Sequence, residues 1–562
     1  MRIKALKNFF ITLFVLLGIS LLYLQIIKGP LYRELSSRNS IRLLKIDAPR
    51  GSIYDRNNKK VAHNAFSFGV FIVPQEISDF DDEIRKLALV TEIPESLLRR
   101  NYKRNYSAPF APCEVARNVP KRKAILVEEM QLDMPGVLVK EIPLRRYPYK
   151  DSLAHVVGYI GEIDKGELEL LKSYGYKVRD MIGKEGIERV TDSILRGRSG
   201  GMQIQVDNRG RRVKVLSFKK PSGGGDIYLT IDAEFQSIVS KMMAGKNGSA
   251  IFMDPRTGEI LSMVSSPSYD PNESLSGVLN DMDSPFLNRA IMGQYPPGSI
   301  FKIILAMAGL DSGKITPASS FICRGRLDIG KDQFNCWKRD GHGPMDMERA
   351  IIESCNVYFY NVGLLVGVEK INEYARLFGL GRKTGIELFG EKEGFIPYRS
   401  WKYKEKKEPW YAGDTANLSI GQGYLLVTPL EVVRVIASVA NGGRLVTPHV
   451  LKRIERSDIE GHREIMLKIR DEDIRTVKLA MRKVIGEGTG ILAWSDLVSI
   501  SGKTGTSQAG AGLKTHAWFG GFAPSENPEI SFVIFLERGG SGGDIPALMA
   551  KKAVEYWYKK RK

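Results

Sequence analysis

One uncharged, largely apolar run near the start constrains this chain of 562 residues more than any other feature. No charged residue occurs from Phe9 to Ile27, and Arg2, Lys4 and Lys7 precede the run. A helix over this run is about 28 Å long, enough to cross the hydrocarbon core of a bilayer. The following segment, QIIKGPLYREL, offers no convincing small-residue cleavage site, so the run predicts a retained anchor rather than a cleaved signal peptide.

The anchor also predicts a location. Residues 1–8 are expected to form a cytoplasmic tail and residues 9–27 a single transmembrane helix. Basic residues on both sides weaken the charge asymmetry, but long domains that follow an anchor are translocated largely regardless of charge. We therefore expect a single-pass protein of the cell (inner) membrane, with everything after about residue 28 outside the cytoplasm, in the periplasm where one exists.

The composition of the whole chain is that of a globular protein, with 43% hydrophobic and 26% charged residues. A formal net charge of +19 is compatible with nucleic acid, an anionic lipid surface or an anionic polymer as a neighbour. The basic residues are spread widely, and we find no zinc finger, basic zipper or RNA-binding aromatic motif in the sequence. We expect no nucleic-acid partner and interpret the charge first as a solvated basic surface.

The clearest domain boundary is KKPSGGGD, residues 219–226, because proline and consecutive glycines interrupt regular structure. Residues 28–225 mix strand-like runs with charged helical stretches. Residues 226–562 begin with a predicted strand in DIYLTI, a helix in AEFQSIVSKMMAG and two strands around a turn in SAIFMDPRTGEILSMVS. These patterns predict an α+β multidomain protein.

The segment QYPPGSIFKIILAMAGL, residues 294–310, changes abruptly from helix-breaking to helix-forming residues. Two prolines and a glycine precede Ser299, and apolar residues then recur at helical spacing. Ser299 is predicted at a helix start, with Lys302 three residues further on the same face. A helix-capping serine would explain the position equally well, and a second Ser-x-x-Lys occurs at Ser217 and Lys220 in a basic stretch.

Two further motifs follow Ser299 in the same part of the chain. Ser354-Cys355-Asn356 lies in AIIESCNVYFYNVG, and Lys503-Thr504-Gly505-Thr506 lies in SISGKTGTSQAG. Serine-x-x-lysine, serine-x-asparagine and lysine-threonine-glycine, in this order, are typical of penicillin-recognising serine enzymes. The order and spacing of the three motifs, rather than any one of them, predict an active site built on Ser299.

The first motif suits the activation of a serine nucleophile. Lys302 can reach the Ser299 hydroxyl, and a buried lysine with a lowered pKa can act as a base. Which group removes the proton stays open at this point, with Lys302 as the preferred candidate. The amide of Ser299 at the helix start and the amide of Thr506 on a strand edge suit stabilisation of an oxyanion.

The other motif residues suit substrate binding and proton transfer. Ser354 and Asn356 fit a proton shuttle and a contact to a substrate amide. Gly505 has no side chain, so substrate backbone can lie against its strand edge. Taken singly, Asn356 could also be a residue that caps a loop, and Lys503 could be an ordinary lysine at the end of a strand. Binding of a terminal carboxylate fits the polar side chains of the last motif, Lys503, Thr504 and Thr506.

Three of the four cysteines lie close together in the sequence, with a histidine among them. Cys323, Cys336, His342 and Cys355 supply three thiolates and an imidazole, a complete set for a closed tetrahedral zinc site. Such a metal would tie the second motif to the loop before it. The alternative is a disulfide between Cys323 and Cys336 in an oxidising compartment, which leaves His342 unexplained. Cys113 is not expected to take part.

These motifs and several longer segments resemble the class B penicillin-binding proteins, and among them the branch that serves cell elongation. APRGSIYDRN, RYPYKDSLAHVVGYIGEI and GKEGIERVTDSILRG are similar to the pedestal of that family. DPRTGEILSMVSSPSYDPN, WKRDGHG, NLSIGQG and THAWFGGFAP are similar to segments of its transpeptidase domain. The resemblance covers nearly the whole chain and implies a central antiparallel sheet flanked by helices, standing on an elongated pedestal.

The resemblance also implies a function. Residues 28–225 would form a pedestal, or dimerisation-like, domain and residues 226–562 a D,D-transpeptidase that cross-links peptidoglycan stem peptides through Ser299. No cofactor would be needed for the chemistry, and β-lactams would be inhibitors. Implied partners are a membrane-embedded rod-system glycan polymerase and elongation scaffold proteins. The alternatives are a D,D-carboxypeptidase, a β-lactamase-type hydrolase or a catalytically silent scaffold; the anchor and long pedestal favour a polymer substrate, and the intact motifs disfavour a scaffold.

Overall fold

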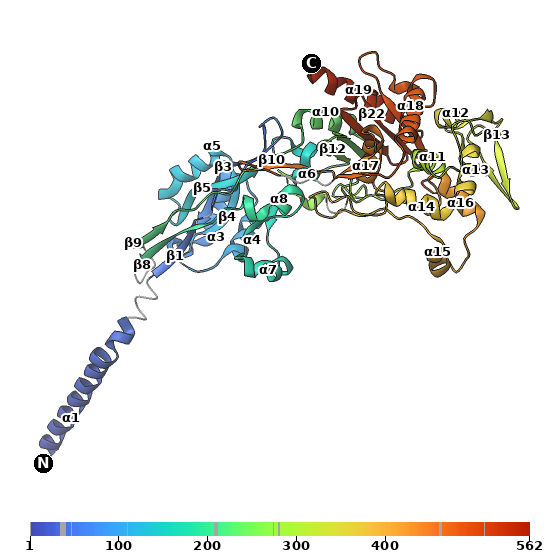
Figure 1. The fold of residues 1–562 in the computed structure, drawn as a ribbon. Coiled ribbons are helices and arrows are strands. Elements are labelled where there is room, and N and C mark those ends of the chain that lie inside the picture. The colour runs from blue at the N-terminus through green and yellow to red at the C-terminus, as the bar shows by residue number, and fades with distance from the viewer. Residues whose placement is uncertain are drawn as a thin grey trace. The chain divides into compact units, whose positions relative to one another are not determined.

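The structure is a computed structural model, and it describes residues 2–33, 41–46, 48–109, 111–206, 212–273, 275–278, 281–459, 464–510 and 512–561. The chain divides into two compact units (Figure 1). Unit 1 contains Met1–Gly51, Asn64–Leu144 and Arg196–Gly224. Unit 2 contains Ser52–His63, Arg145–Leu195 and Gly225–Lys562. Two segments that precede residue 225 in the sequence therefore pack with the segments that follow it.

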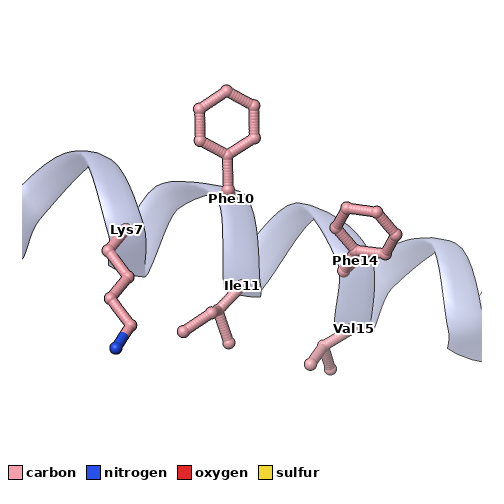
Figure 2. Close-up of a pocket in the computed structure, with 5 residues that line it drawn as sticks. All are labelled: Lys7, Phe10, Ile11, Phe14 and Val15. Atoms are coloured by element: carbon pink, nitrogen blue, oxygen red, sulfur yellow. The ribbon is translucent and has the colours of Figure 1, made fainter.

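The chain begins with a long apolar helix. It consists of α1 (Arg2–Leu22) and a wider helical turn, η1 (Tyr23–Ile27). Over Ile3–Ile27 the mean hydropathy reaches 2.4, and 0% of the most apolar window is buried. Within the described residues, this is the one helix long and apolar enough to cross a membrane by length and composition, and it includes residues 9–27. Figure 2 shows side chains on successive turns of α1: Lys7, Phe10, Ile11, Phe14 and Val15.

Beyond the long apolar helix, the described residues of unit 1 after residue 33 form small antiparallel sheets and three further α-helices. One sheet has the order β1 (Ile41–Ile46), β8 (Gly200–Val206), β9 (Arg212–Lys219). Strand β3 (Lys60–Ile72) pairs with β4 (Cys113–Val119) and β5 (Val137–Arg146). The helices are α3 (Phe80–Thr91), α4 (Glu95–Asn105) and α5 (Lys121–Glu129). Ser217 of the second Ser-x-x-Lys lies on β9 and donates to Gln203 Oε1 over 3.0 Å, so this motif is not at a helix start.

A five-stranded antiparallel sheet forms the centre of unit 2. Its order is β12 (Ile260–Ser266), β11 (Gly248–Met253), β23 (Ile530–Leu536), β22 (His516–Ala523), β21 (Ser501–Ser507). Every residue of β11 and β23 is buried, as expected for central strands covered on both faces. Strand β21, which carries the third motif, is an edge strand.

Helices cover both faces of this sheet. Phe252 of β11 contacts Phe235 of α10 (Ala233–Met243), with ring centroids 5.0 Å apart, and also contacts Phe532 of β23. Phe532 pairs with Gly521, whose neighbour Gly520 faces Ile436 of α17 (Pro429–Ala440). Successive strand residues point to opposite faces, so α10 and α17 lie on opposite sides. Helix α19 (Ile545–Arg561) contacts α10, and α18 (Asp471–Glu487) contacts α17 and β21.

The helix predicted after Ser299 is present and begins at Lys302. A short 3-10 turn, η7 (Gly298–Phe301), leads into α11 (Lys302–Asp311), which is buried from Lys302 to Leu310. Helices of unit 2 in contact with α11 are α12 (Met347–Ile352), α13 (Asn356–Val366), α14 (Val368–Leu377) and α18. Helix α16 (Ala412–Ser419) packs on α13, and α15 (Arg399–Lys406) precedes it.

Short strands and helices complete unit 2. Two small pairs precede α12, β13 (Phe321–Cys323) with β16 (Gly343–Met345) and β14 (Arg326–Ile329) with β15 (Asp332–Asn335). Strand β10 (Ile227–Leu229) pairs with β2 (Ile53–Tyr54) and β18 (Leu451–Ile454). Strand β17 (Arg444–Val446) pairs with β20 (Glu464–Met466), and β19 (Ser457–Asp458) pairs with β18. Residues 145–195 contain α6 (Ala154–Val157), β6 (Ile160–Glu162), α7 (Lys165–Leu171), β7 (Met181–Gly183), α8 (Gly186–Val190) and α9 (Asp192–Leu195).

Candidate active site

Ser299 lies in the turn η7, directly before the buried helix α11. The residues at the N-terminal caps of η7 and α11 are Pro297 and Phe301, and neither helix has a side-chain cap. Ser299 is therefore not a helix-capping residue, which was the alternative interpretation of its position in the sequence. Its side chain is partly exposed, while its neighbours Gly298 and Ile300 are buried.

The turn around Ser299 lies against the edge strand β21. Gly298 has φ +56°, and a Cβ atom on it would lie 2.5 Å from the carbonyl oxygen of Thr506. A Cβ atom on Gly505 would lie 3.0 Å from the Pro297 carbonyl. Ser507 Oγ donates to the Pro296 carbonyl over 2.8 Å. Two glycines thus permit the close approach that places the first motif beside the third.

Lys302 is the first residue of α11, and its side chain is completely buried. Its Nζ donates to the Ser354 carbonyl over 2.8 Å and to Asn356 Oδ1 over 2.7 Å, and it lies 3.3 Å from Ser354 Oγ. Burial lowers the pKa of Lys302 to about 8, while the nearby Cys355 and Cys336 thiols act in the opposite direction. The first and second motifs therefore meet directly, around an amine that can lose its proton near neutral pH.

The second motif forms the turn between α12 and α13. Ser354 has φ +54°, an unusual value for a residue with a side chain, and the Cys355 amide donates to the Ala350 carbonyl over 3.0 Å. This conformation directs both the carbonyl and the hydroxyl of Ser354 toward Lys302. Asn356 is the first residue of α13, so its position is fixed by a buried helix. Strained backbone at a motif residue is typical of functional sites.

Lys503 lies on β21 and is also completely buried. Its Nζ donates to the Thr504 carbonyl over 3.2 Å. Burial first, and the positive charge of Lys302 second, hold the pKa of Lys503 well below its usual range. Thr504 is nearly buried and Thr506 is exposed on the same strand. The structure thus gathers all three motifs, and a basic side chain from each of two motifs enters one site.

The predicted zinc ligands also come together. The donor atoms of Cys323, Cys336, His342 and Cys355 all lie within 4.8 Å of one another. His342 Nδ1 lies 3.4 Å from Cys323 Sγ and 3.6 Å from Cys336 Sγ. Cys323 is the last residue of β13, Cys336 directly follows β15, His342 directly precedes β16, and Cys355 is the N-terminal cap of α13. The three cysteines of this cluster are free thiols, and Cys113 lies in unit 1.

The chemistry of this cluster suits a soft metal ion. A hydrogen bond from Cys355 lowers the pKa of Cys336 to about 4, and the same hydrogen bond raises the pKa of Cys355. The other imidazole nitrogen, Nε2 of His342, is buried and lies 3.8 Å from a Glu353 carboxylate oxygen. A carboxylate behind a metal-binding histidine is a common arrangement at zinc sites. The backbone amide of Asn356 donates to Cys336 Sγ over 3.4 Å, so the cluster adjoins the second motif.

Comparison with known proteins identifies the family. The penicillin-binding protein transpeptidase domain matches residues 248–555, and the penicillin-binding protein dimerisation domain matches residues 45–229. Peptidoglycan D,D-transpeptidase MrdA of Haemophilus influenzae is 33% identical and aligns with 99% of this chain and 93% of its own. The protein of the same name from Acinetobacter baumannii is 35% identical, over 96% of this chain and 85% of its own. This chain is a penicillin-binding protein.

Solved structures agree with this family. The penicillin-binding protein PBP2 of Helicobacter pylori, in complex with MreC, has a TM-score of 0.79 and 28% identity, covering 92% of this chain and 100% of that chain. A structure titled "Structural coordination of polymerization and crosslinking by a peptidoglycan synthase complex" has a TM-score of 0.75 and 27% identity. The match covers 99% of this chain and 98% of that chain. The resemblance to class B penicillin-binding proteins of the PBP2 group is confirmed, and so is the transpeptidase fold with a dimerisation domain.

Thr489 contacts a residue of the third motif, although the sequence did not indicate it as part of the site. Thr489, in the turn after α18, shares a hydrogen bond of 2.7 Å with the hydroxyl of Thr504. Its amide donates to the carbonyl of Ile352, the last residue of α12, over 3.3 Å. Thr489 therefore links the helix before the second motif to the strand of the third. Its only signal in the sequence is a Gly-Thr-Gly turn, which is common in ordinary loops.

Proposed function

We propose that this chain is a D,D-transpeptidase that cross-links peptidoglycan stem peptides during cell elongation. Support comes from relatives that carry this name over nearly their whole length and from the transpeptidase domain match. The observation that carries the mechanism is the contact of the buried Lys302 amine with Ser354 and Asn356 beside the turn of Ser299. A lysine in these surroundings is a suitable base for a serine nucleophile.

In the acylation step, Ser299 Oγ bonds to the carbonyl carbon between two terminal D-alanines while Lys302 Nζ accepts the hydroxyl proton. The amides of Ser299 and Thr506 donate to the developing oxyanion, since Gly298 and Gly505 bring the two backbones together. The C–N bond then breaks. The departing D-alanine amine takes a proton that Lys302 returns through Ser354 Oγ, and the peptide remains as an ester on Ser299.

The second step releases the acyl group to a neighbouring stem peptide. An acceptor amine attacks the ester carbonyl, loses a proton to Lys302 by way of Ser354, and forms the new amide. Ser299 regains its proton, so the net reaction exchanges one amide for another without a cofactor. Asn356 contacts the peptide amide of the donor. The terminal carboxylate of the donor, which leaves with the last D-alanine, binds before acylation to the side chains of the third motif, Lys503, Thr504 and Thr506.

The Cys323, Cys336, His342 and Cys355 cluster is proposed as a structural Zn²⁺ site. Three sulfur donors and one imidazole nitrogen fit tetrahedral zinc, and the short distances among them suit a single ion. A bound ion would stabilise the segment between β13 and α13 rather than take part in acyl transfer. Since Asn356 N–H contacts Cys336, the ion would also help to hold the second motif in place.

The helix of Ile3–Ile27 is proposed as a membrane anchor, with residues 1–8 in the cytoplasm and the catalytic unit in the periplasm. Residues 28–225 are proposed as the pedestal domain and residues 226–562 as the transpeptidase domain, in line with the two family matches. Partners are proposed from the PBP2 structures: an elongation scaffold protein of the MreC type and a glycan polymerase. β-Lactams are proposed as inhibitors that acylate Ser299.

The decisive assay supplies purified full-length protein with glycan strands that bear pentapeptide stems. We expect cross-linked dimers and one released D-alanine per cross-link, and neither product with the Ser299→Ala variant. D-alanine release without dimers would identify a carboxypeptidase. Rapid hydrolysis of penicillin would identify a β-lactamase, and a protein that is inert with both substrates would be a scaffold.

A further inference from the structure

Helix α15 carries aromatic and basic side chains that the chemistry of the three motifs does not use. Figure 1 shows α15 set apart from the other helices of unit 2, at the end of two loops. Tyr403 on this helix is 69% exposed, and Tyr411 and Tyr424, on the chain that follows, are 54% and 36% exposed. Large exposed aromatic rings that gather on one surface often mark a binding site.

Ring and cation contacts join α15 to the chain that precedes and follows it. Trp401 packs between Phe395 and Tyr424, with ring centroids 4.7 Å and 5.1 Å away. Lys406 Nζ lies 5.6 Å from the centre of the Tyr424 ring, and Tyr403 is three residues before Lys406 on the same helix. We define the α15 surface by six residues: Trp401, Tyr403, Lys406, Lys407, Tyr411 and Tyr424.

The composition of this surface distinguishes it from a lipid-binding or coiled-coil face. Residues 398–411, YRSWKYKEKKEPWY, contain no leucine, isoleucine, valine or methionine, so all of their large apolar side chains are aromatic. Lys402 is buried and paired with Asp414 over 2.6 Å. Lys406 and Lys407 are exposed, and no carboxylate pairs with either among the ion pairs of the described residues. Flat rings beside unpaired cations suit a ligand with rings and negative charge.

The α15 surface is connected to the active-site turn by a short piece of chain. The Gly421 carbonyl accepts a hydrogen bond of 2.9 Å from the amide of Gly298, next to Ser299. Gln422 Oε1 accepts from the Gln508 amide, just beyond β21, over 3.4 Å. Tyr424 is three residues from Gly421, so their Cα atoms are at most about 11 Å apart. A polymer whose peptide enters the site can therefore reach this surface.

We propose that the α15 surface binds the glycan strand of peptidoglycan, the polymer that carries the stem peptides. Pyranose rings present apolar C–H faces that pack on aromatic rings, and their acetamido and hydroxyl groups hydrogen-bond to tyrosine hydroxyls. The carboxylates of neighbouring stem peptides attract Lys406 and Lys407. This inference rests on the proposed function, because the same polymer must be the substrate. It adds a binding site for the sugar chain to the site for the peptide.

Binding of purified glycan strands to full-length protein in detergent tests the proposal. The probes are strands with stem peptides and strands from which an amidase has removed them. For the double variant Tyr403→Ala/Tyr424→Ala we expect about tenfold weaker binding of both probes, since each ring contact contributes modestly. Lys406→Glu should weaken only the strands that carry peptide carboxylates, and more at low salt. Phe66→Ala and Lys552→Glu, at exposed positions elsewhere, are the matched controls.

A second readout separates this proposal from the proposed function. Penicillin acylation of the double variant should stay within about twofold of the parent chain, because neither tyrosine belongs to the three motifs, while cross-linking of long strands falls. Failure of penicillin to label the parent chain would remove the proposed function but leave the binding result intact. Unchanged glycan affinity in the double variant would overturn the proposal. Binding to anionic phospholipid vesicles in place of glycan would also overturn it.

Discussion

Lys302 shows how the environment of one residue sets its chemistry. Its amine is completely buried, so the charged form loses hydration, and its pKa falls to about 8. Cys336, directly after β15, and Cys355, at the N-terminal cap of α13, lie near this amine, and so does Lys503 on β21. Ser354 and Asn356 supply the acceptors that keep the buried amine hydrogen-bonded.

The pH dependence of acylation follows from this pKa. Below about pH 8 Lys302 is mostly protonated and cannot accept the Ser299 proton, so the acylation rate should rise with pH and level off above that value. Well below the pKa the rise should be about tenfold per pH unit. Stopped-flow measurement of penicillin acylation from pH 5 to pH 9 checks this expectation.

Lys302→Arg supplies the matched variant. Arginine keeps the positive charge, but because it stays protonated at any ordinary pH it cannot accept the Ser299 proton. The acylation rate should therefore fall by orders of magnitude and lose its rise with pH. An acylation rate that does not change with pH in the parent chain would exclude Lys302 as the base. So would a near-normal acylation rate in the variant.

At the residue scale, the sequence motifs predicted residues that the structure brings together, but not the contacts between them. Ser299, Lys302 and Asn356 could be named because motif order is a property of the chain. The left-handed backbone of Ser354 and the hydrogen bond between Thr489 and Thr504 depend on tertiary packing between segments far apart in sequence. No local pattern encodes such a contact.

At the scale of elements, the close approach of η7 and β21 supports the proposed oxyanion site. Gly298→Ala adds a Cβ atom 2.5 Å from the Thr506 carbonyl at a residue with φ +56°. Gly313 has φ +67°, and a Cβ atom on it would meet nothing within 4 Å, so Gly313→Ala carries the backbone strain alone. We expect Gly313→Ala to cost about 1 kcal/mol of unfolding free energy.

Gly298→Ala should cost about 2 kcal/mol more than Gly313→Ala, and it should slow penicillin acylation at least tenfold because β21 must move away. Denaturant unfolding and acylation kinetics on both variants check the pair. Equal unfolding free energies and equal acylation rates in the two variants would show that the contact between η7 and β21 does not matter for the site.

The cysteine and histidine cluster leads to a prediction at the same scale. Protein purified without added metal should contain about one equivalent of zinc, and chelation or His342→Ala should lower the melting temperature. Penicillin acylation should slow as well, because Asn356 contacts Cys336. Elemental analysis and thiol titration on one sample separate this site from the disulfide alternative, which predicts no metal and two fewer free thiols in denatured protein.

Elements were predicted well where periodicity is strong. The helix of Ala233–Met243 and the strand pair β11 and β12 lie where the sequence places them. The helix after Ser299 begins three residues later than expected, because η7 forms a tighter turn first. The pairing of β11 with β23 joins strands nearly 280 residues apart, which alternation of side chains alone does not indicate.

At the scale of the whole molecule, the two units are interleaved along the chain. Ser52–His63 and Arg145–Leu195 belong to unit 2, although unit 1 segments lie before, between and after them. A buried ion pair of 2.7 Å between Arg145 and Glu188 illustrates the packing of the second segment. Composition can indicate a boundary such as residues 219–226, but it cannot show that an earlier segment returns to a later unit.

The anchor provides a prediction for the whole chain. The full-length protein should sediment with membranes and require detergent for release, because the Ile3–Ile27 helix exposes apolar side chains over its length. A chain that starts at residue 45 behind a cleavable export signal should be soluble in the periplasm. Cell fractionation measures both, and a soluble full-length chain would contradict the anchor.

The most direct test of the proposed mechanism is the mass of the protein after reaction with penicillin. Intact-mass measurement followed by peptide mapping should find one penicilloyl group per chain, on Ser299, and no adduct on the Ser299→Ala variant. Lys302→Arg should carry the same adduct only after much longer incubation. An adduct at another residue, or one that persists at full stoichiometry in Ser299→Ala, would contradict the assignment of Ser299 as the nucleophile.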